Sequence, residues 1–281
     1  MDDKILFAED FYKINEEGSR RSAREIIPLV LKLIQPKSVI DVGCGIGAWL
    51  SVFKEYGIED IVGIDGKWIN KKMLRIPEDR FLSLDIRTPL ILDRQFDLVV
   101  SLEVAEHLPS ECAETFIDNL TRLGPVILFS AAIPLQTGMC HLNEQWPDYW
   151  ARYFRERGYL AIDCIREKIW QNDKVEWWYI QNTLIFARDN YLNNHFLLRE
   201  AFENTSVFQL SIVHPRQYLA PSSEFNALKT KLLSILNSKS YRLISYLDSN
   251  LQKLPVIHNM LDRILCLLFS LRSKFTKIVR K

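Results

Sequence analysis

Two carboxylates and an imidazole lie close together in the sequence Glu103-x-x-Glu106-His107. Residues three and four apart share one face of an α-helix, so a helical segment would bring all three side chains together. Such a set could bind a divalent metal, which would orient a substrate hydroxyl and lower its pKa. His141 could supply a fourth ligand. A simpler interpretation also stays open, in which the cluster belongs to the fold and His107 bonds a neighbouring loop.

A second group of polar and aromatic residues lies between Pro134 and Trp150. Such a mixture does not suit a protein core, whereas long loops often carry binding residues. Histidine titrates near neutral pH, so His141 is the candidate general base. Aromatic faces beside amides and carboxylates also suit a sugar. The candidate substrate-binding residues are Gln136, Asn143, Glu144, Trp146 and Tyr149. The indoles could equally pack the following helix onto the core, and both interpretations can hold together.

A third group is a glycine-rich turn, Gly43-Cys44-Gly45-Ile46-Gly47, which follows a short apolar run. Glycines allow a sharp turn and let a ligand approach the backbone at a helix N-terminus. Together with Ala48 and Asp65, the turn also fits the dinucleotide fingerprint of an NAD-dependent oxidoreductase or epimerase. Asp41 distinguishes the two cofactors by charge. A carboxylate there would repel a pyrophosphate, whereas it would stabilise the sulfonium and ammonium groups of S-adenosylmethionine.

These groups depend on an alternation of strand-like and helix-like segments. Strands that alternate with helices predict a doubly wound, mostly parallel sheet with helices on both faces. In such a sheet the ligand binds beyond the carboxyl ends of the strands, where Asp41, Asp65 and Asp85 are expected. The expected strands are 38–42, 60–64, 81–84, 96–101, 125–130, 159–165 and 182–187, and the expected helices are 21–34, 48–56, 110–122 and 148–157.

The turn D-V-G-C-G-x-G, the acid at the end of the second strand and the segment F-D-L-V-V-S-L-E-V-A-E-H-L resemble the class I S-adenosylmethionine-dependent methyltransferases. The resemblance covers about residues 20–187 and implies a Rossmann-like, seven-stranded sheet with an antiparallel strand at its edge. It also implies which residues hold the cofactor. The methionine moiety would contact Asp41, Gly43, Cys44, Gly45 and Gly47, Asp65 would hold the ribose, Asp85 and Ile86 the adenine, and Ser101, Leu102 and Glu103 would lie below the methyl donor.

Two narrower resemblances bear on the methyl acceptor. The segments S-A-A-I-P-L-Q-T-G-M-C-H-L-N-E-Q-W-P-D-Y-W and W-Y-I-Q-N resemble bacterial methyltransferase-domain proteins associated with glycan or natural-product pathways. The expected acceptor is therefore a hydroxyl on a sugar, a glycan or a small metabolite, with His141 as the base. The pattern E-x-x-E-H instead resembles ubiquinone-pathway O-methyltransferases and small-RNA 2′-O-methyltransferases. That resemblance implies a metal-assisted alternative, on an RNA 2′-hydroxyl or a catechol, through Glu103, Glu106 and His107.

The strand–helix rhythm ends near residue 187 and divides the chain. Residues 1–187 are expected to form the catalytic domain, with 1–36 as a helical lead-in. Residues 188–221 are expected to be an irregular connector and 222–281 a helical extension. The last segment, 261–281, is apolar and then basic, so a peripheral contact with an anionic membrane is one expectation for it.

The bulk composition excludes several other classes of protein. A formal net charge of +1 gives no global attraction to nucleic acid, and we expect no such partner. The five cysteines are scattered, without the C-x-x-C spacing of zinc or dithiol sites. The first ten residues contain three aspartates and a glutamate and no apolar run, so a cytoplasmic location is expected. A non-enzymatic cofactor-binding scaffold remains an alternative, and the oligomeric state is left open.

Overall fold

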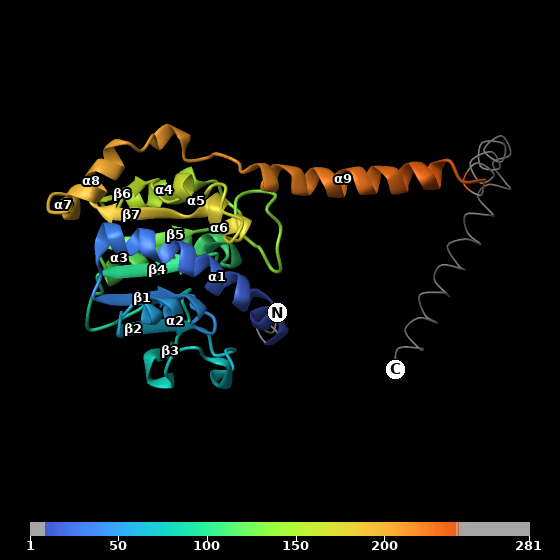
Figure 1. Ribbon diagram of the computed structural model, residues 1–281. Coiled ribbons are helices and arrows are strands. Elements are labelled where there is room, and N and C mark those ends of the chain that lie inside the picture. The colour runs from blue at the N-terminus through green and yellow to red at the C-terminus, as the bar shows by residue number, and fades with distance from the viewer. Residues whose placement is uncertain (1–8, 240, 242–281) are drawn as a thin grey trace. The chain divides into compact units, whose positions relative to one another are not determined.

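A computed structural model describes residues 9–239 and 241. The strands are β1 (Ser38–Val42), β2 (Asp60–Asp65), β3 (Phe81–Ser83), β4 (Leu98–Leu102), β5 (Val126–Ser130), β6 (Tyr159–Ile162) and β7 (Leu184–Arg188). The α-helices within the described ranges are α1 (Glu9–Ile34), α2 (Ala48–Glu55), α3 (Ala113–Leu123), α4 (Pro147–Arg155), α5 (Arg166–Ile169), α6 (Trp177–Asn182), α7 (Asp189–Leu192), α8 (Phe196–Glu203) and α9 (Pro215–Leu236) (Figure 1).

The strands form one seven-stranded sheet in the order β3-β2-β1-β4-β5-β7-β6. β7 runs antiparallel to both of its neighbours, and the other adjacent pairs are parallel. The predicted Rossmann-like sheet, mostly parallel with antiparallel pairing at one side, is therefore confirmed. The chain turns from one half of the sheet to the other between β1 and β4, and the crevice at their carboxyl ends is where such sheets bind ligands.

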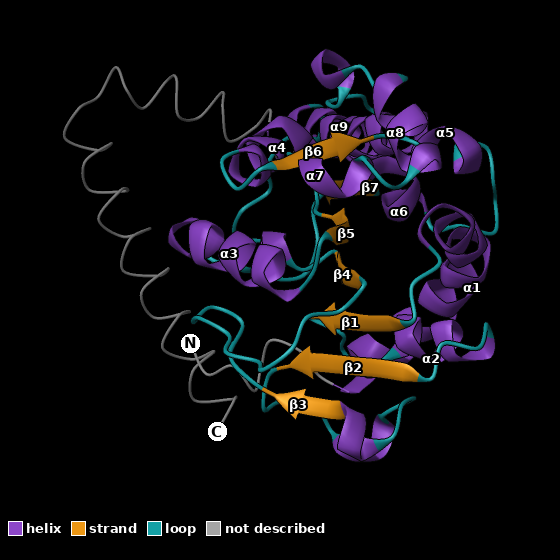
Figure 2. Cartoon of the chain, turned by 90° about the vertical axis from the view of Figure 1, so that its left-hand side faces the viewer, coloured by secondary structure: helices purple, strands orange, loops and turns teal. Residues whose placement is uncertain are grey.

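Helices cover both faces of the sheet because alternate residues of its buried strands point to opposite sides. On one face, Val39 and Leu128 pack with residues of α1, α2, α6 and α8. On the other face, Ile40 and Ile127 pack with residues of α3 and α4. Figure 2 shows the sheet between α3 on one side and α1 and α2 on the other. The glycine turn therefore follows a strand, β1, that packs against an apolar core on each face of the sheet.

Three elements differ from the sequence predictions. α1 begins at Glu9, twelve residues before the expected start. The residues before the expected strand 182–187 form helix α6, which includes Asn182, and β7 begins only at Leu184. The expected connector 188–221 contains α7 and α8, and its Leu192, Leu198 and Leu210 are buried. This segment is therefore helical and packed rather than irregular.

The contacts within the chain divide it into two units, residues 1–221 and 222–281. All of the sheet, and α1 to α8, belong to the first unit. Within the described residues, no helix combines the length and apolar content needed to span a bilayer. The amphipathic segment 261–281 lies outside the described residues, so its expected membrane contact stays a prediction.

Candidate active site

The glycine turn directly follows β1 and leads into α2. Gly43, Gly45 and Gly47 have φ values of +85°, +54° and +82°, which residues with side chains rarely adopt. Space is limited too, since a Cβ atom at Gly43 would lie 2.5 Å from the side chain of Val104. The N–H groups of Gly43 and Cys44 both donate to the carbonyl oxygen of Ile64, at 2.8 and 3.0 Å. The end of β2 therefore holds the turn in place.

Asp41 and Asp65 lie on the neighbouring strands β1 and β2, and both are buried. Burial, together with the nearby Asp65 carboxylate, raises the pKa of Asp41 well above its ordinary value. Burial also raises the pKa of Asp65 to about 6, although the N–H groups of Gly45 and Gly66 donate to it at 2.7 and 2.6 Å. Two buried carboxylates beside one turn make this end of the site favourable for a cation.

The predicted adenine-binding residues follow β3. Asp85 is exposed and forms an ion pair with Arg87 at 2.8 Å, and this guanidinium lowers its pKa. Ile86 is buried in the core that contains α3. Neither residue lines the cavity described below, and neither does Asp65. Their assignment to adenine and ribose therefore stays a prediction.

β4 ends in Ser101 and Leu102, and Glu103 follows it. The hydroxyl of Ser101 is buried and donates to the carbonyl oxygen of Val42 at 2.8 Å, so it ties β4 to β1. Leu102 lines the cavity. Glu103 has a φ of +55°, and its N–H donates to the hydroxyl of Ser130 at the end of β5. The carboxyl ends of three adjacent strands are thus joined at this point.

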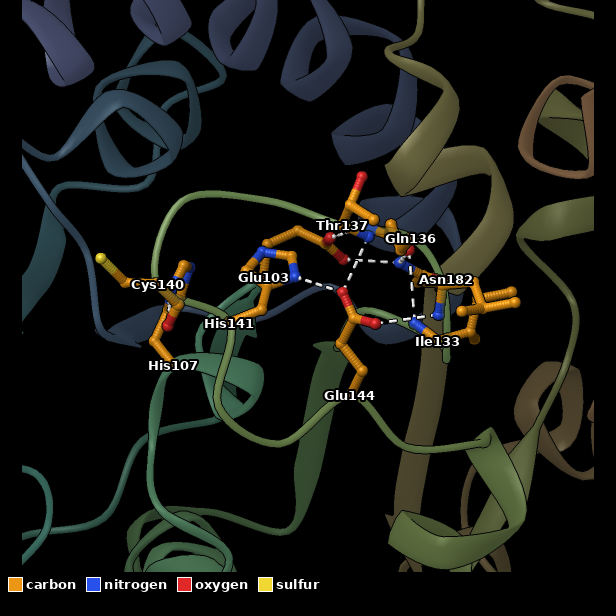
Figure 3. Close-up of polar contacts among 10 residues, drawn as sticks. Glu103, His107, Ile133, Gln136, Thr137, Cys140, His141, Glu144 and Asn182 are labelled. Carbon is orange, nitrogen blue, oxygen red and sulfur yellow. Dashed lines mark hydrogen bonds and ion pairs between the residues drawn. The ribbon is translucent and has the colours of Figure 1, made fainter. Parts of the chain in front are cut away.

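Two amides hold the carboxylate of Glu103. Gln136 donates to one oxygen at 2.8 Å and Asn182, from α6, donates to the other at 3.0 Å (Figure 3). Asn182 also donates to the amide oxygen of Gln136 at 2.9 Å. Burial raises the pKa of Glu103. The bond between Asn182 and Glu103 could not be predicted from the sequence, because nothing in W-Y-I-Q-N shows that a short helix brings this amide back to β4.

Glu106, His107 and His141 form a second cluster, with one potential ligand atom of each residue within 4.8 Å of the others. Glu106 is fully buried, and neither of its carboxylate oxygens has a hydrogen-bond partner. The rings of His107 and His141 lie 4.9 Å apart, centre to centre. Burial and the neighbouring His141 lower the pKa of His107 to about 4, so this imidazole is neutral at physiological pH.

Glu103 does not join this cluster, because the segment is not the α-helix considered from the sequence. Glu103 lies in the left-handed region, and residues 105–107 form a 3-10 helix. The spacing i, i+3, i+4 therefore does not place all three side chains on one face. Of the four ligands considered from the sequence, the structure brings together Glu106, His107 and His141.

The loop from residue 131 to residue 146 folds back onto the strand ends. The N–H groups of Leu142 and Asn143 donate to the carbonyl oxygen of Glu106, at 2.7 and 2.9 Å, and that of Gln145 donates to Ala132 at 3.1 Å. These bonds place His141 beside His107. They also turn the following residues away from the site.

The five predicted substrate-binding residues are consequently divided. Gln136 lines the cavity, and the other four do not. Asn143 is buried and accepts from Gln145, Trp146 is partly exposed, and Tyr149 packs edge-on against Trp150 at 4.9 Å. Glu144 bonds the loop itself. The packing interpretation of the two indoles thus holds for Trp150, which is buried, and not for Trp146, which is exposed.

One cavity of about 320 Å³ joins these parts. The glycine turn and Asp41 lie at one end, and the Glu106–His107–His141 cluster lines it together with Glu103. Helices α1 and α6 also contribute to the wall of the cavity. The cavity-lining residues from these two helices are Glu16, Ser19, Trp177, Trp178 and Tyr179.

Comparison with known proteins gives one family match. A family model described as a methyltransferase domain matches residues 14–185, more than half of the chain. No curated protein matches the chain.

Solved structures of similar fold include three bacterial proteins. DesVI of Streptomyces venezuelae is 14% identical, with a TM-score of 0.48 over 67% of this chain and 99% of that one. CalS10, a SAM-bound amino pentose methyltransferase of Micromonospora echinaspora, is 14% identical, with a TM-score of 0.49 over 65% and 97%. The methyltransferase domain of bacterial CtHen1 is 21% identical, with a TM-score of 0.46 over 60% and 98%.

Proposed function

The chain belongs to the methyltransferase-domain family of class I S-adenosylmethionine-dependent enzymes, and on that premise we propose that it methylates a hydroxyl of a sugar, a glycan or a small metabolite. The observation that carries the proposal is the single cavity that contains both the glycine turn with Asp41 and His141. Family membership decides against the NAD-dependent oxidoreductase or epimerase that the glycines alone allow.

The cofactor end of the cavity suits the charge of S-adenosylmethionine. This cofactor carries a sulfonium and an ammonium group, and the carboxylate of Asp41 lines the cavity without a neighbouring guanidinium or ammonium in the lining. Because burial and Asp65 disfavour the ionised form of Asp41, a cation bound there restores a favourable environment for the charge.

His141 supplies the base in this proposal. The acceptor oxygen attacks the methyl carbon, the bond from that carbon to sulfur breaks, and S-adenosylhomocysteine leaves as a neutral thioether. The hydroxyl proton passes to the ring of His141. Its Nδ1 lies 2.8 Å from a carboxylate oxygen of Glu144, which leaves the other ring nitrogen available to take the proton.

Two indoles support a sugar-type acceptor. Trp177 and Trp178 line the cavity, and so do the polar Gln136 and Thr137. An apolar wall with a few polar groups is typical of small-molecule sites. The acceptor would lie against the indoles while the amide of Gln136, already bonded to Glu103, fixes its polar end.

The test is methyl transfer from isotope-labelled S-adenosylmethionine to polysaccharide, lipid, small-molecule and RNA fractions of host cells. We expect label in a sugar-containing or small-molecule fraction, as an ether stable to mild base. His141→Gln should lower kcat at least 100-fold, whereas the control His195→Gln should not. Label in RNA, or on nitrogen, would contradict the proposed acceptor, and no label in any fraction would favour a cofactor-binding scaffold.

A metal-assisted reaction is the second candidate, and one observation favours it. Burial and the neighbouring Glu103 raise the pKa of Glu106 well above its ordinary value, so its carboxylate form needs a nearby cation, and two imidazoles lie within reach of the same ion. These residues fit a divalent cation: Glu106, His107 and His141 would hold Mg²⁺, Mn²⁺ or Zn²⁺. A bound cation would orient the acceptor hydroxyl and lower its pKa.

Metal content separates the two candidates. In the metal-assisted reaction, elemental analysis of the purified protein finds one divalent ion per chain, His107→Ala loses that ion, and EDTA stops turnover. In the metal-free reaction, turnover in EDTA is unchanged. Glu111→Ala, an exposed carboxylate near the same segment, is the matched control and should keep any bound ion.

A further inference from the structure

The loop over the cavity has a strained backbone. Leu135, Thr137 and Cys140 have φ values of +68°, +56° and +61°. Within the described ranges, they make up three of the five non-glycine residues with positive φ. Residues other than glycine are uncommon in this region because their Cβ atom crowds the backbone. A loop of this kind persists only if specific contacts hold it.

The carboxylate of Glu144 makes those contacts. One of its oxygens accepts from the N–H of Leu135 at 2.9 Å, and the other accepts from the N–H of Thr137 at 2.8 Å (Figure 3). Hydrogen bonds to an ionised acceptor are stronger than those between neutral groups. Two of the three strained residues are thus bonded through their own backbone to one side chain.

The same carboxylate holds His141. Nδ1 of His141 lies 2.8 Å from the oxygen that also accepts from Thr137. An ionised carboxylate has no proton to give, so Nδ1 carries the hydrogen and Nε2 carries the lone pair. Gly138 packs against that second nitrogen, since a Cβ atom there would lie 2.2 Å from Nε2. Both His141 and Gly138 line the cavity.

We propose that Glu144 is a positioning residue, which folds the strained loop and fixes the tautomer of His141 so that Nε2 serves the reaction. The proposal rests on the proposed function, because it assigns Nε2 as the working atom of that site. It also replaces the substrate-binding role expected for Glu144 from the sequence. Both candidate reactions need this tautomer, since a base and a metal ligand each use an unprotonated nitrogen.

The tautomer is measured directly, without activity, by long-range proton–nitrogen correlation spectra of the full chain labelled with ¹⁵N-histidine. His141→Gln identifies the signals. We expect wild-type His141 as the Nδ1–H form, and Glu144→Leu should lose that form because it leaves Nδ1 without an acceptor. A wild-type signal from the Nε2–H form, or an unchanged signal in Glu144→Leu, would overturn the proposal. Glu111→Gln is the control for loss of an exposed charge and should leave the spectrum unchanged.

Kinetics give the second readout. Glu144→Leu should lower kcat 10- to 100-fold and change the Kd for S-adenosylhomocysteine less than twofold, because the residues around the glycine turn are unchanged. Adding Leu135→Gly, at a strained residue that does not line the cavity, relieves the backbone there, so it should recover loop order while kcat stays low. Full recovery of kcat would contradict the role in positioning His141. If the tautomer is as expected but the wild-type protein transfers no methyl groups, the proposed function fails and the positioning role stands.

Discussion

At the scale of single residues, charge is what distinguishes this site. The glycines allow a close ligand, and the charge of Asp41, which lines the cavity, is what we expect to favour a cationic ligand over a pyrophosphate. The sequence predicts this role for Asp41 because it lies two residues before Gly43, the first glycine of the turn. The positioning role proposed for Glu144 has no such signal in the sequence. It depends on the loop folding back through Leu142 and Asn143, and no local sequence pattern predicts that fold.

The buried Asp65 gives a pH prediction. Its pKa is raised from an ordinary 3.8 to about 6, so the folded state favours the protonated form. The stability that this provides is present below pH 3.8 and is lost as the pH rises through 6. Between pH 4 and 7, the free energy of unfolding of the ligand-free wild type should therefore fall by about 2 to 2.5 kcal/mol relative to Asp65→Asn.

Urea denaturation at several pH values measures this difference. Removing Asp65 also lessens the rise in the pKa of Asp41, which acts in the same direction. If the free energy of unfolding changed with pH in the same way in both proteins, Asp65 would not titrate in this range.

At the scale of elements, the sequence predicted the strands better than the helices. Buried apolar runs ending in Asp41, Asp65 and Asp85 locate β1, β2 and β3 within one or two residues. The sequence did not predict α6 because its six residues, Trp177 to Asn182, are too few to show a helical spacing of apolar side chains. It forms through tertiary contacts, since Tyr179 is buried against α1 and α2.

Tyr179 joins three helices at the cavity wall. Its hydroxyl lies 3.1 Å from that of Ser19 on α1, and the indole N–H of Trp49 on α2 donates to it at 3.3 Å. Tyr179→Phe should therefore lower the free energy of unfolding by about 1 to 2 kcal/mol, since a buried indole donor loses its partner.

Chemical denaturation and hydrogen exchange test this prediction. Amide exchange should become faster in α1, and the exposed Tyr56→Phe should change stability by less than about 0.5 kcal/mol. Unchanged protection of α1 in Tyr179→Phe would show that the helices are held by apolar contacts alone.

At the scale of the whole molecule, the catalytic unit extends beyond the last strand. Leu192, Leu198 and Leu210 are buried within residues 1–221. Burial of one leucine contributes about 1.5 to 3 kcal/mol. A fragment of residues 1–221 should fold and bind S-adenosylhomocysteine as the full chain does. A fragment that ends at residue 187 should lose cooperative unfolding. Equal stability of the two fragments would restore the boundary predicted from the sequence.

We propose that Asp41 makes the cavity specific for a cationic cofactor. Calorimetric titration of the full chain with S-adenosylmethionine, S-adenosylhomocysteine and NAD tests this role, with Asp41→Asn as the isosteric variant. We expect wild type to bind both adenosyl compounds and not NAD. Asp41→Asn should weaken S-adenosylmethionine at least tenfold, equivalent to about 1.4 kcal/mol. Equal affinity of the variant for S-adenosylmethionine, or tighter binding of NAD by wild type, would contradict the account.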